Sequence, residues 1–279
     1  MGQRRQISGS RTLITGASQG IGLALAEACA QRGGKVIAAA RSADLLDQLA
    51  QKANAAAFTL VPAVADITVA ADRKRLIDTA VEQFAGLDIL INNAGIGATG
   101  HFVEASTDRL RRIMEVNFLG VAELTRLALP LLRAGHRPAI VNISSIAGRR
   151  GIPARSEYSA SKFAVEGFSE ALRAELVKNG IDVLVVAPGL TQTNFSKNML
   201  EQKARAPVDH MRGMTAEAVA FATLRAIEKG RDKTVLTVQG KLLTLVSRFL
   251  PRLADRIAAR KVRALYRDEI ERRQQRTNN

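Results

Sequence analysis

The chain has 279 residues, of which 47% are hydrophobic and only 7 are proline, so it can form a packed globular core, and a largely disordered chain is excluded. Its formal net charge of +15 favours anionic partners but predicts no particular fold. Cys29 is the only cysteine, which excludes an internal disulfide framework and is typical of a reducing compartment. Residues 1–10 lack the apolar segment of a secretory signal, and no apolar run is long enough to span a bilayer. We therefore expect a cytoplasmic protein, attached at most peripherally to a membrane surface.

Short β-rich runs alternate with longer helical runs along the chain. We expect strands at 12–15, 36–40, 58–64, 89–91, 139–143, 183–186 and 234–238, and helices at 21–32, 42–52, 71–84, 110–132 (as one helix or two), 157–178 and 216–229. Because the strands are uniformly apolar, they predict a parallel sheet covered by helices on both faces. The sequence thus predicts one doubly wound, Rossmann-like α/β domain over residues 1–240, followed by a basic amphipathic helical extension over 241–279.

A glycine-rich turn, Thr15–Gly22, directly follows the first predicted strand. Glycines there let the backbone approach a pyrophosphate closely, and the N-terminus of the next helix supplies free N–H groups and a positive dipole end. The spacing is Gly-x-x-x-Gly-x-Gly rather than the commoner dinucleotide spacing. A tight turn without a ligand is the alternative, but the position after the first strand favours dinucleotide binding.

The second predicted strand ends at Arg41, at a point where an acidic residue would bind the adenosine ribose hydroxyls. No acid is present there, and a guanidinium can hold a 2′-phosphate through two hydrogen bonds. Arg41 therefore favours NADPH over NADH, with an ordinary surface arginine as the alternative. Asp66, just after the third strand, is placed to contact the adenine or, alternatively, to cap the following helix.

Two further polar segments follow predicted strands. Asn92-Asn93-Ala94-Gly95 follows the fourth strand, where amide side chains can tie neighbouring loops together and small residues leave room for a cofactor. Ser144-Ser145 follows the fifth strand, where a hydroxyl can donate to a substrate oxygen. A purely structural role is the alternative for both segments.

Tyr158 and Lys162 lie four residues apart in the predicted helix 157–178, so their side chains share one face. A nearby ammonium favours the phenolate and lowers the pKa of a tyrosine, which suits protonation of an alkoxide near neutral pH. The pair is a weak signal alone, because many helices carry it by chance.

Together these segments resemble the short-chain dehydrogenase/reductase superfamily, in its single-domain Tyr-x-x-x-Lys branch. The resemblance covers roughly Arg11 to Val238 and includes the glycine turn, Asn-Asn-Ala-Gly, the serine strand end, Tyr-Ser-Ala-Ser-Lys, and a Pro-Gly-x-x-x-Thr pattern that starts at Pro188. The occurrence of all these motifs in the family's order is highly specific.

The resemblance implies roles for four catalytic residues. Tyr158 would be the general acid in reduction and the base in oxidation, and Lys162 would bind the nicotinamide ribose and lower the pKa of the tyrosine. Ser145, thirteen residues before Tyr158, matches the active serine better than Ser144 does. Asn117 matches the asparagine that holds a water in the proton relay. All four positions carry the expected residue type.

The same resemblance implies that NADP, with NADPH favoured over NADH, is bound by a set of residues at the strand ends: Gly16, Ser18, Gln19, Gly20, Ile21, Gly22, Arg41, Asp66, Asn93, Ala94, Gly95, Tyr158, Lys162, Pro188, Gly189 and Thr193. Gln19 stands where some NADPH-using members carry a basic residue. The implied function is an NADP(H)-dependent carbonyl reductase or alcohol dehydrogenase, and the implied assembly is a homodimer or homotetramer. The alternative is a non-catalytic NADP-binding redox sensor or regulatory protein, which the complete catalytic set disfavours. No metal-ligand cluster of cysteine and histidine appears.

Residues 190–214 lie where this family varies most, over the substrate, and they carry Phe195, Met199, Leu200, Met211 and Met214 among polar residues. Such an apolar, methionine-rich surface suits a mobile lid over an apolar carbonyl or alcohol substrate. The alternative is that these side chains pack the lid against the domain. His210 is expected to be an exposed loop residue.

The extension after residue 240 carries an apolar row beside a basic row: Leu245, Phe249, Leu253 and Ile257, and Arg248, Arg252, Arg256 and Arg260. Pro251 should start a new helix or kink a single one. The favoured interpretation is that the apolar row packs on the domain or on a second subunit. Peripheral contact of residues 241–267 with an anionic membrane is the second interpretation. We expect no nucleic-acid binding, because aromatic content is 4% and no recognition motif is present.

Overall fold

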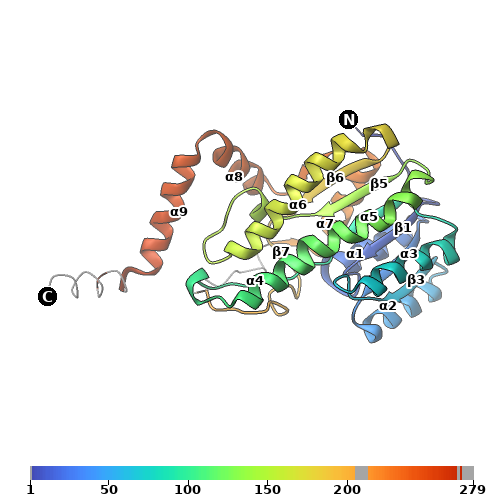
Figure 1. Cartoon of the computed structure of the whole chain (residues 1–279), viewed down its shortest axis with the longest axis horizontal. Helices are drawn as coiled ribbons and strands as arrows, with labels where there is room; N and C mark the ends of the chain where they lie inside the picture. The colour runs from blue at the N-terminus through green and yellow to red at the C-terminus, as the bar shows by residue number, and fades with distance from the viewer. Residues whose placement is uncertain (1, 205–212, 269–270, 272–279) are drawn as a thin grey trace.

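The computed structural model describes residues 2–204, 213–268 and 271 (Figure 1). Its strands are β1 (Arg11–Thr15), β2 (Lys35–Ala40), β3 (Leu60–Val64), β4 (Ile89–Asn92), β5 (Ala139–Ile143), β6 (Asp182–Ala187), β7 (Thr191–Gln192), β8 (Met214–Thr215) and β9 (Lys233–Val235). Its α-helices are α1 (Gly20–Gln31), α2 (Ala43–Ala55), α3 (Ala70–Phe84), α4 (Thr107–Met114), α5 (Gly120–Arg133), α6 (Ser156–Glu175), α7 (Ala216–Glu228), α8 (Val238–Phe249) and α9 (Pro251–Leu265).

Within the described residues, one parallel sheet of seven strands has the order β3-β2-β1-β4-β5-β6-β9. The chain moves outward from β1 to β3, then returns to pair β4 against the free side of β1. The loops after β1 and β4 therefore diverge at the sheet centre, which leaves a crevice at their carboxyl ends. The predicted doubly wound α/β fold is confirmed.

Successive residues of each central strand point to opposite faces, and each face has its own core. On one face Ile14 packs with side chains of α1, α2 and α7. On the other face Leu13 packs with side chains of α3, α5 and α6. The strands are apolar throughout because both faces are covered. Cys29 is fully buried in the first of these cores, as expected of an inert core residue.

Two predicted segments differ from the structure. The helix expected at 110–132 runs from Thr107 to Arg133, but residues Glu115–Leu119 form a π-helical turn between α4 and α5. Such turns widen a helix locally and often occur at functional sites. The strand expected at 234–238 is only Lys233–Val235, because Thr237 caps α8 by accepting a hydrogen bond from the Gly240 N–H.

Helices α8 and α9 form an arm that projects from the domain beyond the strand ends (Figure 1). Pro251 begins α9, as predicted. The apolar row is largely exposed: its four members, Leu245, Phe249, Leu253 and Ile257, are between 45% and 68% exposed. The expectation that the row packs on the domain is therefore wrong for Leu245, Phe249 and Leu253, which are not part of the cavity lining, whereas Ile257 lines the cavity. None of the described helices has the length and apolar character needed to cross a bilayer.

Candidate active site

A cavity of about 1360 Å³ opens at the carboxyl ends of the central strands. It brings together most of the residues that the sequence singled out: Gly16, Ser18, Gln19, Gly20, Ile21, Arg41, Asp66, Asn93, Ala94, Gly95, Ser145, Tyr158, Lys162, Pro188, Gly189 and Thr193. Two predicted residues, Gly22 and Asn117, are not part of the lining; both are buried.

The turn between β1 and α1 is compact enough to require glycine. Gly16 and Gly20 have φ of +68° and +57°, which side chains rarely tolerate. A Cβ at Gly22 would lie 2.1 Å from the Gly16 carbonyl oxygen, so no other residue fits between α1 and the turn. The N-cap residue Gln19 makes no side-chain capping hydrogen bond, which leaves first-turn N–H groups of α1 available to an anion.

Asn93 holds this turn against β4. Its side-chain amide donates to the Thr15 carbonyl at 2.9 Å, and the Thr15 hydroxyl accepts from the N–H groups of Asn93 and Ala94 at 3.1 Å each. The expectation that an amide at this strand end ties neighbouring loops together is therefore met. Asn92 has a different role, because it donates to Thr125 and Asn142 inside the domain.

Arg41 lines the cavity, with 63% of its side chain exposed. Its Nη1 is 4.0 Å from Asp66 Oδ2, and Arg112 Nη2 is 3.6 Å from the same oxygen. Two guanidinium groups therefore lie close to the Asp66 carboxylate.

Asp66 does not cap α3, contrary to the alternative raised above. Its Oδ1 accepts from the N–H and hydroxyl of Thr68, at 2.9 and 2.7 Å, and the N-cap of α3 is Val69. Partial burial opposes ionisation, but these hydrogen bonds and the charges of Arg112 and Arg41 hold the pKa of Asp66 below its usual range. The carboxylate is thus fixed and charged where it lines the cavity.

Tyr158 stands on the first turn of α6 and receives a hydrogen bond from Ser145 at the end of β5. Burial raises the pKa of Tyr158, whereas this hydrogen bond and the charge of Arg155 act to lower it. That Lys162 lowers this pKa stays a prediction. The Lys162 ammonium lies 5.9 Å from the centre of the Tyr158 ring and donates to the Ile143 carbonyl at 2.9 Å.

Lys162 is buried, and burial lowers its pKa to about 8, although the neighbouring Glu166 opposes this change. Glu166 is one helical turn further along α6, and Arg149 Nη2 lies 2.9 Å from its Oε2. Ser144 is turned toward this carboxylate, whereas Ser145 faces Tyr158. The choice of Ser145 over Ser144 as the serine near the reacting group agrees with this arrangement.

Asn117 lies in the π-helical turn and is fully buried. Its amide donates to the Ile96 carbonyl and to the Ser161 hydroxyl, both at 2.9 Å, and its Oδ1 accepts from the Ile96 N–H at 2.8 Å. Both amide hydrogens are therefore used by protein groups. The side chain joins the loop after β4 to α6.

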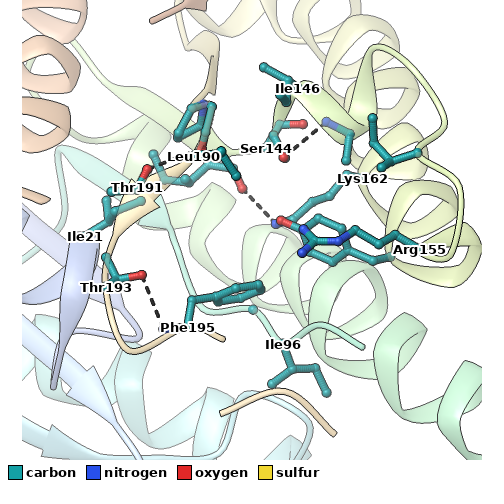
Figure 2. A pocket seen from close by; sticks show the side chains of 18 of the residues that line it. Ile21, Ile96, Ser144, Ile146, Arg155, Lys162, Leu190, Thr191, Thr193 and Phe195 are labelled. Atoms are coloured by element: carbon teal, nitrogen blue, oxygen red, sulfur yellow. Dashed lines mark hydrogen bonds between the residues drawn. The ribbon is translucent and has the colours of Figure 1, made fainter. Parts of the chain in front are cut away.

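Residues 190–204 cover one side of the cavity (Figure 2). The ring of Phe195 lies 5.8 Å from that of Tyr158, and the Phe195 N–H donates to the Thr193 hydroxyl at 3.3 Å. The second half of the segment pairs with the loop after β4, through hydrogen bonds of 2.8 Å from Thr99 N–H to Glu201 and from Lys203 N–H to Thr99. Met211 and His210 lie outside the described residues.

An arginine that the sequence analysis missed joins this covering segment to α6, the helix that carries Tyr158. Arg109 on α4 is 4% exposed, and its Nε donates to Glu157 at 2.9 Å while its Nη1 donates to Glu201, also at 2.9 Å. Glu157 directly precedes Tyr158. No local pattern reveals this cluster, because its members come from three separate segments.

Replacing Arg109 by Lys should lower the free energy of unfolding by about 1–2 kcal/mol, because an ammonium cannot serve both carboxylates through a rigid planar fork. Urea denaturation measures this change. Arg111→Lys on the same helix, where the side chain is 77% exposed, should stay within about 0.5 kcal/mol. Equal losses in the two variants would contradict the role given to Arg109.

The arm forms the outer wall of the cavity, which the sequence analysis also missed. Its contribution to the lining is mainly apolar: Leu242, Leu243, Val246, Ala254, Ile257, Ala258, Val262 and Leu265. Arg150 pairs with Asp255 on α9, and the rings of His101 and Tyr266 lie 4.7 Å apart, so both ends of α9 contact the domain.

The residues present fit a nicotinamide dinucleotide. The glycine turn leaves a cradle that a Cβ at Gly16 or Gly22 would fill, and the N-terminus of α1 borders it. Arg41 and Asp66 lie at one end of the crevice, and Tyr158 and Lys162 lie at the other.

Comparisons with known proteins agree with this site. A family model described as short chain dehydrogenase matches residues 10–204. The ketoacyl reductase HetN of Nostoc sp. is 34% identical over 260 residues, which cover 90% of this chain and 88% of HetN. A short chain dehydrogenase/reductase from Burkholderia phymatum, solved with NAD, has a TM-score of 0.82 at 26% identity, over 89% of this chain and 96% of that one. A short chain dehydrogenase from Burkholderia cenocepacia, solved with NADP, has a TM-score of 0.77 at 28% identity, over 91% of this chain and 99% of that one.

Proposed function

Because the chain belongs to the short-chain dehydrogenase family and is an oxidoreductase of that class, we propose that it reduces an apolar carbonyl compound with NADPH, or oxidises the corresponding alcohol. The observation that carries this proposal is the meeting of Ser145, Tyr158 and Lys162 in one cavity, with Ser145 hydrogen-bonded to Tyr158.

In the proposed mechanism the substrate oxygen lies between Ser145 and Tyr158. Ser145 donates a hydrogen bond to that oxygen and stabilises the negative charge that develops on it. Tyr158 gives its phenolic proton to the oxygen during reduction and removes it during oxidation. The bound nicotinamide supplies or accepts the hydride. Lys162 would hold the cofactor ribose, and a proton from solvent would return to Tyr158 through Lys162, Asn117 and water.

An apolar substrate is supported by the cavity wall and by one relative. The arm lines the outer cavity with leucine, valine, isoleucine and alanine side chains, and Phe195 covers the reacting end. The relative HetN is named a ketoacyl reductase, and such a name fits a carbonyl carried on an apolar chain. Apolar lining with few polar groups is the usual composition of a site for such a ligand.

The test is NADPH oxidation over a panel of ketones and aldehydes of increasing chain length. Turnover that rises with apolar chain length supports the proposal. Binding of NADPH with no turnover of any compound, and no oxidation of the matching alcohols by NADP⁺, would favour the alternative of a non-catalytic NADP-binding redox sensor.

Replacing Arg41 by Ser should weaken NADPH binding about 10-fold and leave NADH binding unchanged. The reason is that the side chain can form charge-assisted hydrogen bonds only with a 2′-phosphate, which NADH lacks. Fluorescence titration with each cofactor measures both affinities, and NADH is the matched control. An equal loss for the two cofactors would contradict the preference for NADPH.

We also propose a homo-oligomer, either a dimer or a tetramer, and a cytoplasmic location. The exposed apolar row on α8 and α9, with exposed Arg248, Arg252, Arg256 and Arg260 beside it, supports contact with a second copy of the chain or with an anionic membrane surface.

A further inference from the structure

Arg155 is the N-cap residue of α6, three positions before Tyr158, and its side chain points into the cavity (Figure 2). Its Nη2 atom is buried without a hydrogen-bond partner. No carboxylate among the described residues forms an ion pair with it, although it lies close enough to Tyr158 for its charge to act on the phenol. A free guanidinium therefore faces the position where the substrate reacts.

Of the four other cations that line the cavity, three have a carboxylate close by, and the fourth, Lys261, lies on α9 in the outer wall. Lys162 donates to the Ile143 carbonyl and has Glu166 beside it, and Arg150 pairs with Asp255. Arg41 lies 4.0 Å from Asp66. Arg155 is thus the cation near the reacting end that the described residues leave without a counter-charge.

Burying an unpaired charge is unfavourable, and burial lowers the pKa of Arg155, with the nearby Tyr158 opposing this change. A ligand that brings one negative charge to this point removes the penalty, and a carboxylate matches the planar fork of a guanidinium through two hydrogen bonds. A carboxylate also carries the single charge needed to neutralise one arginine.

We propose that Arg155 binds a carboxylate of the substrate and so selects oxo acids and hydroxy acids. This inference rests on the proposed function and narrows its substrate class. The reacting carbon would lie by Ser145 and Tyr158, and the charge of Arg155 acts on the Tyr158 phenol, so the carboxylate would lie close to the carbonyl. The apolar remainder of the molecule then extends along the wall formed by the arm.

The experiment compares 3-hydroxydodecanoate with its methyl ester, which has the same chain and no charge. Wild-type protein with NADP⁺ should oxidise the acid with the higher kcat/KM. Arg155→Met should lower kcat/KM for the acid by about 30- to 100-fold and for the ester by less than about 3-fold. Arg155→Lys, which keeps a positive charge, should lose less of the preference for the acid.

Binding separates this inference from the proposed function. Calorimetry on Tyr158→Phe, with NADP⁺ present, measures affinity without turnover. The proposal expects 3-hydroxydodecanoate to bind more tightly than the ester, and it expects the further change Arg155→Met to remove this difference. Such a result supports the anion site even if the wild-type protein shows no turnover and the proposed function fails. Equal affinity for the acid and the ester overturns the role of Arg155, and so does an equal loss of affinity for both in Arg155→Met. Turnover of the ester by the wild-type protein would still support the proposed function in that case.

Discussion

Tyr158→Phe is expected to reduce turnover on the order of 10³-fold, the largest effect on activity that we predict. The change removes one hydroxyl and keeps the ring that packs 5.8 Å from Phe195, so the cavity wall is preserved. The variant loses the proposed proton donor, and it also loses the hydrogen bond that Ser145 gives to this oxygen. Steady-state NADPH oxidation with the best carbonyl compound of the panel measures the loss.

The control for this variant is its own cofactor affinity and thermal unfolding. Thermal unfolding should remain close to the wild-type value, because the ring is kept and the core volume does not change. Cofactor affinity should fall by less than about 3-fold, because Tyr158 is one contact among many in the implied cofactor site. Turnover within a factor of a few of wild type would refute the assignment of Tyr158 as the acid. A parallel fall in cofactor affinity and thermal stability would show that the ring was needed for folding rather than for chemistry.

Gly22→Ala is expected to lower the free energy of unfolding by about 3 kcal/mol or more and to abolish tight NADPH binding. The added methyl group would lie 2.1 Å from the Gly16 carbonyl oxygen and 2.4 Å from Asn93 Nδ2. Because backbone cannot move aside as a flexible side chain can, α1 must shift away from β1. That shift would open the turn in which we place the pyrophosphate. Urea denaturation and NADPH fluorescence titration measure the two losses.

Gly167→Ala is the matched control, because it makes the same chemical change in the middle of α6. A Cβ at Gly167 meets nothing within 4 Å, and Gly167 is exposed. Since alanine favours the helix over glycine, this variant should be more stable by about 0.5–1 kcal/mol and should bind NADPH normally. Similar stabilities for the two variants would show that the contact between α1 and the glycine turn is looser than the structure indicates.

Much of the site could be predicted from local sequence because strand ends and turns have local signals. The turn Thr15–Gly22 indicates close backbone approach through its glycines, and the spacing of Tyr158 and Lys162 places both on one helix face. Arg155 also has a local signal, since it precedes Tyr158 by three residues and α6 begins at Ser156. Its importance was not apparent, because a sequence does not show which charges lack a partner.

Other parts of the site depend on segments that are distant in the chain. Arg109 meets Glu157 and Glu201 across separations of 48 and 92 residues, and neither pairing follows from spacing or composition. The amphipathic pattern after residue 240 predicted a helical extension, but it did not indicate which face would line the cavity. The structure shows that the face of α9 with Ala254, Ile257, Ala258, Val262 and Leu265 lies by the cavity, and that Leu245, Phe249 and Leu253 are exposed.

The sequence by itself determined the α/β class, the order of the elements and the residue types available at the strand ends. Periodicity, glycine turns and strand apolarity depend on neighbours in the chain, so they can be read without coordinates. Only the tertiary structure decided which charges are neutralised near Tyr158. Electrostatic interactions and burial depend on distances between segments, and the folding of the sheet and arm around one cavity leaves Arg155 without a carboxylate partner among the residues that the structure describes.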